Sequence, residues 1–234
     1  MVTDDHEDYT GDVTPGGEPD VRRLGDLTLT KVAVDPAMSN NCYILHCGVT
    51  DEVVLIDAAA EPERLLELIG DRSLTSIVTT HQHWDHHRAL AAVKAAHPGA
   101  VVVAGEPDAD AIEEQTGVAV DRRVGAGDKI AVGTCDLQVI PVAGHTPGSI
   151  CLLVDDTSIA PTPHLFTGDC LFPGGVGATR GDDAAALFTQ LLGEVETKIF
   201  ERLPDETWFY PGHGSDSVLG NERPHLEEWR ERGW

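Results

Sequence analysis

The segment T-H-Q-H-W-D-H-H at positions 80–87 constrains this chain more than any other. It directly follows a short apolar run that is typical of a strand. In an extended or tightly turned segment His81 and His83 point the same way, because side chains alternate in direction. As the chain turns into the next helix, Asp85 and His86 come round to a second position. Imidazole nitrogens and a carboxylate are ligands that divalent transition metals prefer, so the segment predicts a metal centre rather than a solvated helix start.

Three later segments each place a metal-ligand residue type at the end of an expected strand. They are V-A-G-H-T-P-G-S with His145, L-F-T-G-D-C-L-F with Asp169, and W-F-Y-P-G-H-G with His213. Loops at strand ends are where a rigid scaffold presents functional groups, and the glycine beside each residue lets the backbone approach closely. Taken singly, such a histidine is more often structural or exposed than a metal ligand. Together with the first cluster they predict one shared site.

The rest of the chain alternates between strand and helix patterns. Runs rich in β-branched and aromatic residues predict strands, and apolar residues at helical spacing predict helices. Strand-rich halves with helices between them indicate two sheets, each covered by helices. The expected strands cover 27–34, 41–45, 52–57, 76–80, 100–105, 129–133, 135–142, 149–154, 164–168 and 207–210; the expected helices cover 61–69, 88–96 and 183–202.

The organisation of the chain is predicted to be one domain behind a short tail. Residues 1–20 are polar and rich in Gly, Pro, Asp and Glu, so we expect a disordered acidic tail followed by a folded domain over 21–234. No apolar run is long enough to span a bilayer. The first residues lack the apolar region of a signal peptide, so we expect a cytoplasmic protein.

The charge balance disfavours several classes of partner. Asp and Glu number 40 against 16 Lys and Arg, which gives a formal charge of −24. Such a field repels phosphate backbones and anionic lipids, so we expect neither nucleic acid nor membrane as a partner. The 5 cysteines are scattered without a C-x-x-C pair, so buried free thiols are expected rather than disulfides or a cysteine-rich zinc site.

Together with V-L-I-D, which ends at Asp57, these four segments resemble in order the five motifs of the metallo-β-lactamase superfamily over about residues 25–220. The resemblance implies a four-layer αββα sandwich of two mixed sheets flanked by helices, with the metals at one edge between the sheets. It also implies a role for each motif residue. One metal would take His81, His83 and His145, the other Asp85, His86 and His213, with Asp169 bridging both and Asp57 of V-L-I-D orienting the loop without touching metal.

Two such ions, most simply zinc although iron and manganese also suit these ligands, can hold a hydroxide that attacks a carbonyl. The chain has no G-x-S-x-G nucleophile elbow that would point to a serine hydrolase. Within the superfamily, the motifs look most like those of glyoxalase II-like thioester hydrolases. The resemblance therefore implies cleavage of a small acyl-thioester, of the S-lactoylglutathione type or made with another low-molecular-weight thiol. Asp85 would orient the hydroxide or accept its proton.

The sequence also departs from that branch. The loop F-P-G-G-V-G-A-T-R-G (172–181) and the short acidic segment after His213 lack the features associated with glutathione recognition. Arg180 and Arg223 are the cations expected near the mouth of the site, either binding a substrate carboxylate or forming surface salt bridges. His87 stands where small residues are usual, as a support for the ligands or as a solvated helix-start residue.

Three alternatives stay open at this point. The same dimetal site could hydrolyse a lactone or ester. A mononuclear iron persulfide dioxygenase, which looks similar in these motifs, would use His81, His145 and Asp169 alone. A metal-storage protein without catalytic activity is the remaining possibility, although a full ligand set with a bridging carboxylate leaves a position for reactive water.

Overall fold

The computed structural model describes residues 9–233 and contains two mixed β-sheets. In the first sheet the strands lie in chain order from β1 to β7. Strands β1 to β4 pair antiparallel, whereas β4 to β7 pair parallel. The strands are β1 (Asp20–Leu24), β2 (Leu27–Val34), β3 (Asn40–Cys47), β4 (Glu52–Ile56), β5 (Ser73–Thr79), β6 (Val101–Gly105) and β7 (Arg122–Val124).

The second sheet has the order β15-β14-β11-β10-β9-β8. Its only parallel pair among the described strands is β11 with β14, so the carboxyl ends of these two strands meet at one edge. A small separate hairpin lies beyond β11. The strands are β8 (Lys129–Val132), β9 (Cys135–Pro141), β10 (Ile150–Val154), β11 (His164–Gly168), β14 (Trp208–Pro211) and β15 (Ser217–Val218), and the hairpin is β12 (Leu171–Phe172) with β13 (Gly175–Val176).

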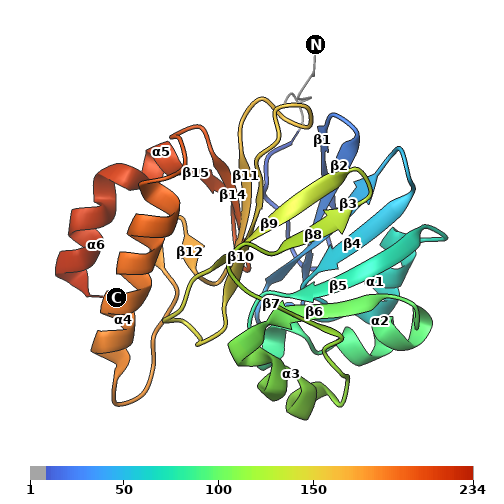
Figure 1. Cartoon of the computed structure of the whole chain (residues 1–234), viewed down its shortest axis with the longest axis horizontal. Coiled ribbons are helices and arrows are strands. Elements are labelled where there is room, and N and C mark those ends of the chain that lie inside the picture. Colours follow the sequence, from blue (N-terminus) through green and yellow to red (C-terminus); the bar gives the residue numbers. More distant parts are fainter. Residues whose placement is uncertain (1–8, 234) are drawn as a thin grey trace.

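Helices cover the outer face of each sheet, as Figure 1 shows. Outside the first sheet lie α1 (Pro62–Ile69), α2 (Leu90–Ala96) and α3 (Ala109–Thr116), and outside the second lie α4 (Ala184–Val195), α5 (Leu219–Glu222) and α6 (Leu226–Arg232). One buried apolar cluster joins α1 to α3 with β2 to β6, and another joins α4 and α6 with β9 to β11 and β14. The expected αββα sandwich is confirmed.

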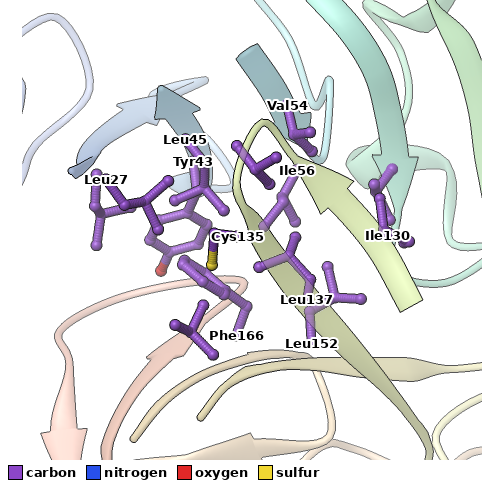
Figure 2. Packing of buried hydrophobic residues seen from close by; sticks show 14 of the residues in the cluster. Leu27, Tyr43, Leu45, Val54, Ile56, Ile130, Cys135, Leu137, Leu152 and Phe166 are labelled. Carbon is purple, nitrogen blue, oxygen red and sulfur yellow. The ribbon is translucent and has the colours of Figure 1, made fainter. Parts of the chain in front are cut away.

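A third apolar cluster fills the space between the sheets (Figure 2). Side chains alternate across a strand, so Leu27 and Leu29 of β2 face this interior whereas Val32 and Val34 face the helices. Strands with both faces buried need apolar residues on both, which explains the nearly continuous apolar runs seen in the sequence. The inward residues that Figure 2 labels are Leu27, Tyr43, Leu45, Val54 and Ile56 from the first sheet, and Ile130, Cys135, Leu137, Leu152 and Phe166 from the second.

The expected elements form close to their expected bounds, with a few differences. The expected helix 183–202 is observed as α4 continued by a wider π-type turn, η3 (Glu196–Phe200). The sequence patterns did not predict helices α3 and α6. Helix α3 buries Ala109 and Ile112 and α6 buries Trp229, so neither carries a clear apolar stripe. All five cysteines are buried and free, as expected.

Order begins earlier than the sequence predicts. Residues 1–8 of the expected disordered tail 1–20 lie outside the described residues. Tyr9, however, is 7% exposed, and its ring meets Trp208 edge-on with 6.0 Å between centroids. The prediction that order starts near Val21 is thus corrected, because one aromatic ring anchors a segment whose composition is otherwise polar.

Within residues 9–233, no helix has the length and apolar character needed to cross a membrane.

Candidate metal centre

The carboxyl ends of β5, β11 and β14 lie at the same edge of the sandwich and carry the predicted site residues. His81 follows β5, Asp169 follows β11, and His213 follows β14. His145 lies in the connection between β9 and β10. Carboxyl ends of strands at a sheet edge are a favoured place for active sites, because the loops there are held by rigid elements.

Three histidine rings converge at one point of this edge. The Nε2 atom of His81 lies 3.1 Å from Nδ1 of His83 and 3.3 Å from Nε2 of His145. The same two atoms of His83 and His145 are 2.9 Å apart. Spacing along the chain brings His81 and His83 together, and the β9–β10 loop brings the third ring. These three nitrogen atoms could hold one metal ion.

A second group lies directly beside the first. The short helix η1 (Trp84–His86) turns Asp85 and His86 towards His213. The Nε2 atoms of His86 and His213 are 3.2 Å apart, and Oδ2 of Asp85 lies 3.5 and 3.4 Å from them. Asp169 lies between the groups, with its carboxylate 3.4 Å from His86, 3.6 Å from His145 and 3.5 Å from His213.

The outer nitrogens of four rings are held by acceptors, which decides where the inner lone pairs point. Nδ1 of His145 donates to the Ala178 carbonyl and Nδ1 of His213 donates to the Met38 carbonyl, each at 2.9 Å. A carbonyl can only accept, so in the neutral rings these protons sit on Nδ1 and leave Nε2 free. Histidine ligands in metalloproteins are oriented in this way.

Asp57 orients two more histidine rings, that of His86 directly and that of His81 through Thr80. Its carboxylate accepts the Thr80 N–H at 2.7 Å, the Thr80 hydroxyl at 2.8 Å and Nδ1–H of His86 at 2.9 Å. The Thr80 oxygen, having used its proton, accepts Nδ1–H of His81 at 3.1 Å. The Asp57 backbone has φ 57°, a left-handed conformation that is rare for a residue other than glycine and clusters at functional sites.

The two groups differ in electrostatics. Burial lowers the pKa of His81 and takes that of His145 to about 4, so both rings are neutral at pH 7. Burial also opposes protonation of His213, but hydrogen bonds to Asp169 and Asp85 outweigh it and raise its pKa to about 9. In His86 the nearby carboxylates again outweigh burial and raise the pKa. The second group, with Asp85 in it and Asp169 beside it, therefore favours positive charge where Nε2 of His86 and His213 meet.

Glycines permit the close approach of backbone to this cluster, as the sequence predicts. A Cβ atom on Gly212 would lie 2.2 Å from Oδ1 of Asp169 and 2.7 Å from Cε1 of His86. A Cβ atom on Gly177 would lie 1.9 Å from the Asp169 carbonyl oxygen. Both positions exclude a side chain unless the ligand residues move.

A pocket of about 590 Å³ opens over the cluster. His83, Asp85, His145, Asp169 and His213 form its floor. Its walls are largely apolar, and Trp84 at the rim is 52% exposed. Within residues 9–233 no hydrogen bond or ion pair engages the Arg180 guanidinium, which also lines the pocket. The remaining wall residues are Met38, Trp84, Phe172, Val176 and Ala178.

Two expectations for neighbouring residues are corrected. Arg223 does not line this pocket; its guanidinium forms the surface salt bridge of the other alternative, with Asp205, and also donates to the carbonyls of Phe200 and Leu203 at the end of η3. His87 is not a solvated helix-start residue. It is 3% exposed, and its Nε2 atom lies 3.2 Å from the Gln82 carbonyl oxygen, so it supports the loop between His81 and His83.

The structure adds one residue that sequence reasoning missed. Asn40 is fully buried at the start of β3, and its Nδ2 donates to Oδ2 of Asp85 at 3.0 Å. The same atom lies 3.4 Å from Nε2 of His213. The pair Asn40–Asn41 before an apolar strand was the available signal, because buried amides need specific partners.

The chain is similar to proteins of a known superfamily. The chain matches the model of the metallo-beta-lactamase superfamily over residues 35–213. It is 36% identical over 190 residues to the hydroxyacylglutathione hydrolase of Polaromonas sp., covering 80% of this chain and 66% of that protein. It is 31% identical over 186 residues to the human hydroxyacylglutathione hydrolase-like protein, covering 78% of this chain and 59% of that protein. The chain thus spans less than two thirds of the length of these relatives.

Solved structures give the same fold. ETHE1 from Myxococcus xanthus matches with a TM-score of 0.72 and 28% identity over 87% of this chain and 84% of that one. The di-iron-bound form of TTHA1623 matches with a TM-score of 0.63 and 32% identity over 82% and 96%. The chain belongs to the metallo-β-lactamase superfamily, a superfamily of metallo-hydrolases whose fold implies divalent metal binding.

The described residues fit such a metal centre. Oδ1 of Asp169 is buried and has no hydrogen-bond partner among residues 9–233, which leaves a carboxylate oxygen free beside the ring nitrogens. Nitrogen lone pairs and carboxylates that face one another at these distances repel unless a cation lies among them.

Proposed function

We propose that this protein is a dinuclear metal-dependent hydrolase that cleaves a small acyl-thioester. The observation that carries the proposal is that two complete ligand groups meet at one carboxylate, Asp169. The first group comprises His81, His83 and His145, and the second comprises Asp85, His86 and His213. Zinc suits both groups, and iron or manganese would be accepted by the same ligand types.

When bound, two such ions would supply a hydroxide at neutral pH and polarise the substrate carbonyl. The protein's own residues would do the rest. Asp85, whose carboxylate is fixed by Asn40, would orient the attacking oxygen or accept its proton. Asp57 would keep His81 and His86 in the tautomers that leave their inner nitrogens free.

The pocket suits a small substrate with an apolar stretch and a negative end. The rim offers Met38, Trp84 and Phe172, and the Arg180 guanidinium has no partner among the described residues that would neutralise it. A small acyl-thiol with a carboxylate fits this combination. The names of the curated relatives support a thioester of the hydroxyacylglutathione kind.

A second candidate is the mononuclear iron dioxygenase reading, in which His81, His145 and Asp169 alone hold iron. The likeness to ETHE1 of Myxococcus xanthus favours it. The complete second group of Asp85, His86 and His213 favours the hydrolase, because a mononuclear centre would not need these ligands close together. Lactone or ester hydrolysis at the same site is the third candidate.

The test is an assay of S-lactoylglutathione cleavage by the purified protein, with release of the free thiol and oxygen uptake recorded together. We expect thiol release without oxygen uptake, and at least a hundredfold loss of kcat in Asp169→Asn. Arg180→Ala should raise KM with little change in kcat, because it would act on the remote end of the substrate. Oxygen uptake with a persulfide substrate and no thioester cleavage would overturn the proposal.

A further inference from the structure

Two buried aspartates outside the ligand groups each accept three hydrogen bonds, two on one carboxylate oxygen and one on the other. Asp108, at the end of η2 (Glu106–Asp108), is fully buried. Its Oδ2 accepts the Gln82 N–H at 2.9 Å and the Thr146 hydroxyl at 2.6 Å, and its Oδ1 accepts the Gly148 N–H at 2.7 Å. Gln82 stands between two ligands of the first group, and Thr146 follows the third. One carboxylate therefore joins the two loops that carry that group.

Asp216 has the corresponding place beside the second group. Its side chain is 0% exposed, and its Oδ1 accepts Nζ of Lys31 at 2.6 Å. Its Oδ2 accepts the Tyr9 hydroxyl at 2.7 Å and Nε1–H of Trp208 at 3.2 Å. Nζ of Lys31 also donates to the Gly214 carbonyl at 2.9 Å, directly after His213. This ion pair thus holds the loop that carries His213.

Lys31 is placed for this contact by the strand pattern. It lies on β2 two residues beyond Leu29 and so faces the interior between the sheets. A buried ammonium ion is costly unless every proton has an acceptor, and its acceptors are Asp216, Gly214 and Gly11. The buried ion pair adds no apolar packing that would offset this cost. Its contacts instead fix the loop of His213, which points to a positioning role.

We propose that Asp108 and Asp216 are positioning residues, each setting the metal affinity of one half of the dinuclear centre. Asp108 acts on the group of His81, His83 and His145 through the Gln82 and Thr146 contacts. Asp216, with Lys31, acts on the second group through the loop of His213. The inference rests on the proposed dinuclear centre and adds which residue outside the ligand set controls which metal.

Asparagine is the informative replacement because it keeps the shape and removes one acceptor. In Asp108→Asn the amide NH₂ must face either the Gly148 N–H or the two donors on the other oxygen. In Asp216→Asn it must face either Lys31 or the two aromatic donors. Each orientation leaves a buried donor without an acceptor, so the attached loop shifts.

The experiment measures Zn²⁺ affinity of the full chain in backgrounds that keep one half of the centre. His213→Ala should retain the first site alone, and His83→Ala the second alone. Metal-depleted proteins are titrated with Zn²⁺ in competition with a chromophoric chelator. We expect Asp108→Asn to weaken binding about 10–100-fold in the His213→Ala background and to leave the His83→Ala background within about twofold. Asp216→Asn should give the reciprocal result.

Two further variants guard against a general loss of fold. Tyr9→Phe removes one hydrogen bond from Asp216 and should weaken the second site alone, by a smaller factor. Ile130→Val trims a buried side chain between the sheets and should lower the unfolding temperature without changing either affinity. Circular dichroism checks that each variant is folded.

The outcomes separate the two proposals. Wild-type protein that binds fewer than two Zn²⁺ ions would reject the dinuclear centre itself. Wild-type protein that binds two, with both asparagine variants weakening both sites equally or neither site, would overturn the positioning roles and leave the dinuclear centre intact.

Discussion

Glycine at position 212 shows how closely single residues are fitted to this site. Oδ1 of Asp169 and the ring carbon Cε1 of His86 occupy the space that a Cβ atom would need. We therefore expect Gly212→Ala to displace these ligands and to lower bound metal and kcat by at least tenfold. Metal analysis of the purified variant measures this. Gly193→Ala makes the same chemical change in α4, where nothing lies within 4 Å, and should bind metal normally. Normal metal content in Gly212→Ala would contradict the geometry.

Cys47 makes a prediction about pH that is independent of the metal ligands. Burial opposes ionisation of this thiol, but hydrogen bonds from Thr134 and Thr50 outweigh it and lower its pKa from 9.0 to about 6. A group whose pKa is depressed by folding adds stability above its unfolded pKa and loses it as the pH falls through the folded value. The gap in unfolding free energy between wild type and Cys47→Ser should therefore widen from pH 6 to pH 9. Urea unfolding at both pH values tests it, and a constant gap would count against a lowered pKa.

At the scale of elements, η1 carries Asp85 and His86 of the proposed second metal group and, in Trp84, part of the pocket rim. Trp84 lies between the ligands His83 and Asp85, and its ring is covered by Arg88 at 4.8 Å, which in turn pairs with Asp35. This chain of contacts holds an exposed ring at the pocket rim. In the proposed function, substrate recognition and metal binding would therefore share one short helix.

Removing this ring should affect binding more than chemistry. We expect Trp84→Ala to raise KM for an apolar acyl-thioester by roughly fivefold, about 1 kcal/mol, with kcat within twofold. Val49→Ala, which removes another exposed apolar side chain away from the pocket, is the control. Steady-state kinetics on both variants decide the point. A fall in kcat at unchanged KM would instead place Trp84 in the ligand geometry.

The elements also show how far the sequence could predict this molecule. Strand and helix patterns predict two sheets covered by helices, because both faces of each sheet are buried and read as apolar runs. The αββα arrangement followed from the resemblance of the motifs to the metallo-β-lactamase superfamily. The candidate ligands could be found because His81, His83, Asp85 and His86 form a dense cluster directly after an apolar run, and because His145, Asp169 and His213 each follow a glycine at a strand end. Asp108 and Asp216 could not be found, because their partners come from loops and strands far apart in the sequence. The place of Arg223 was wrong for a similar reason: its partners lie around η3.

At the scale of the whole molecule, the site links the two halves of the sandwich. His81, His83, Asp85 and His86 follow β5 of the first sheet, whereas the other ligands come from loops of the second. A metal ion bound across these loops stabilises the folded state, by about 2.7 kcal/mol when it is present at a hundred times its dissociation constant.

Metal removal should therefore lower the unfolding temperature. For a chain of this size we expect a drop of roughly 5–11 °C after chelation, reversed by added Zn²⁺. Differential scanning calorimetry at fixed pH and ionic strength measures it. The control is Asp169→Asn, which should show a smaller response. An unfolding temperature that neither chelator nor Zn²⁺ changes would show that the ligands do not bind metal across the sheets.

Counting the metal ions per chain tests whether one carboxylate, that of Asp169, joins two metal sites. Inductively coupled plasma mass spectrometry of the wild-type protein and of His213→Ala gives this number. We predict close to two ions per chain in the wild type and close to one in the variant. A single ion in both, particularly iron, would rule out the dinuclear centre, because the group of Asp85, His86 and His213 would then hold no metal.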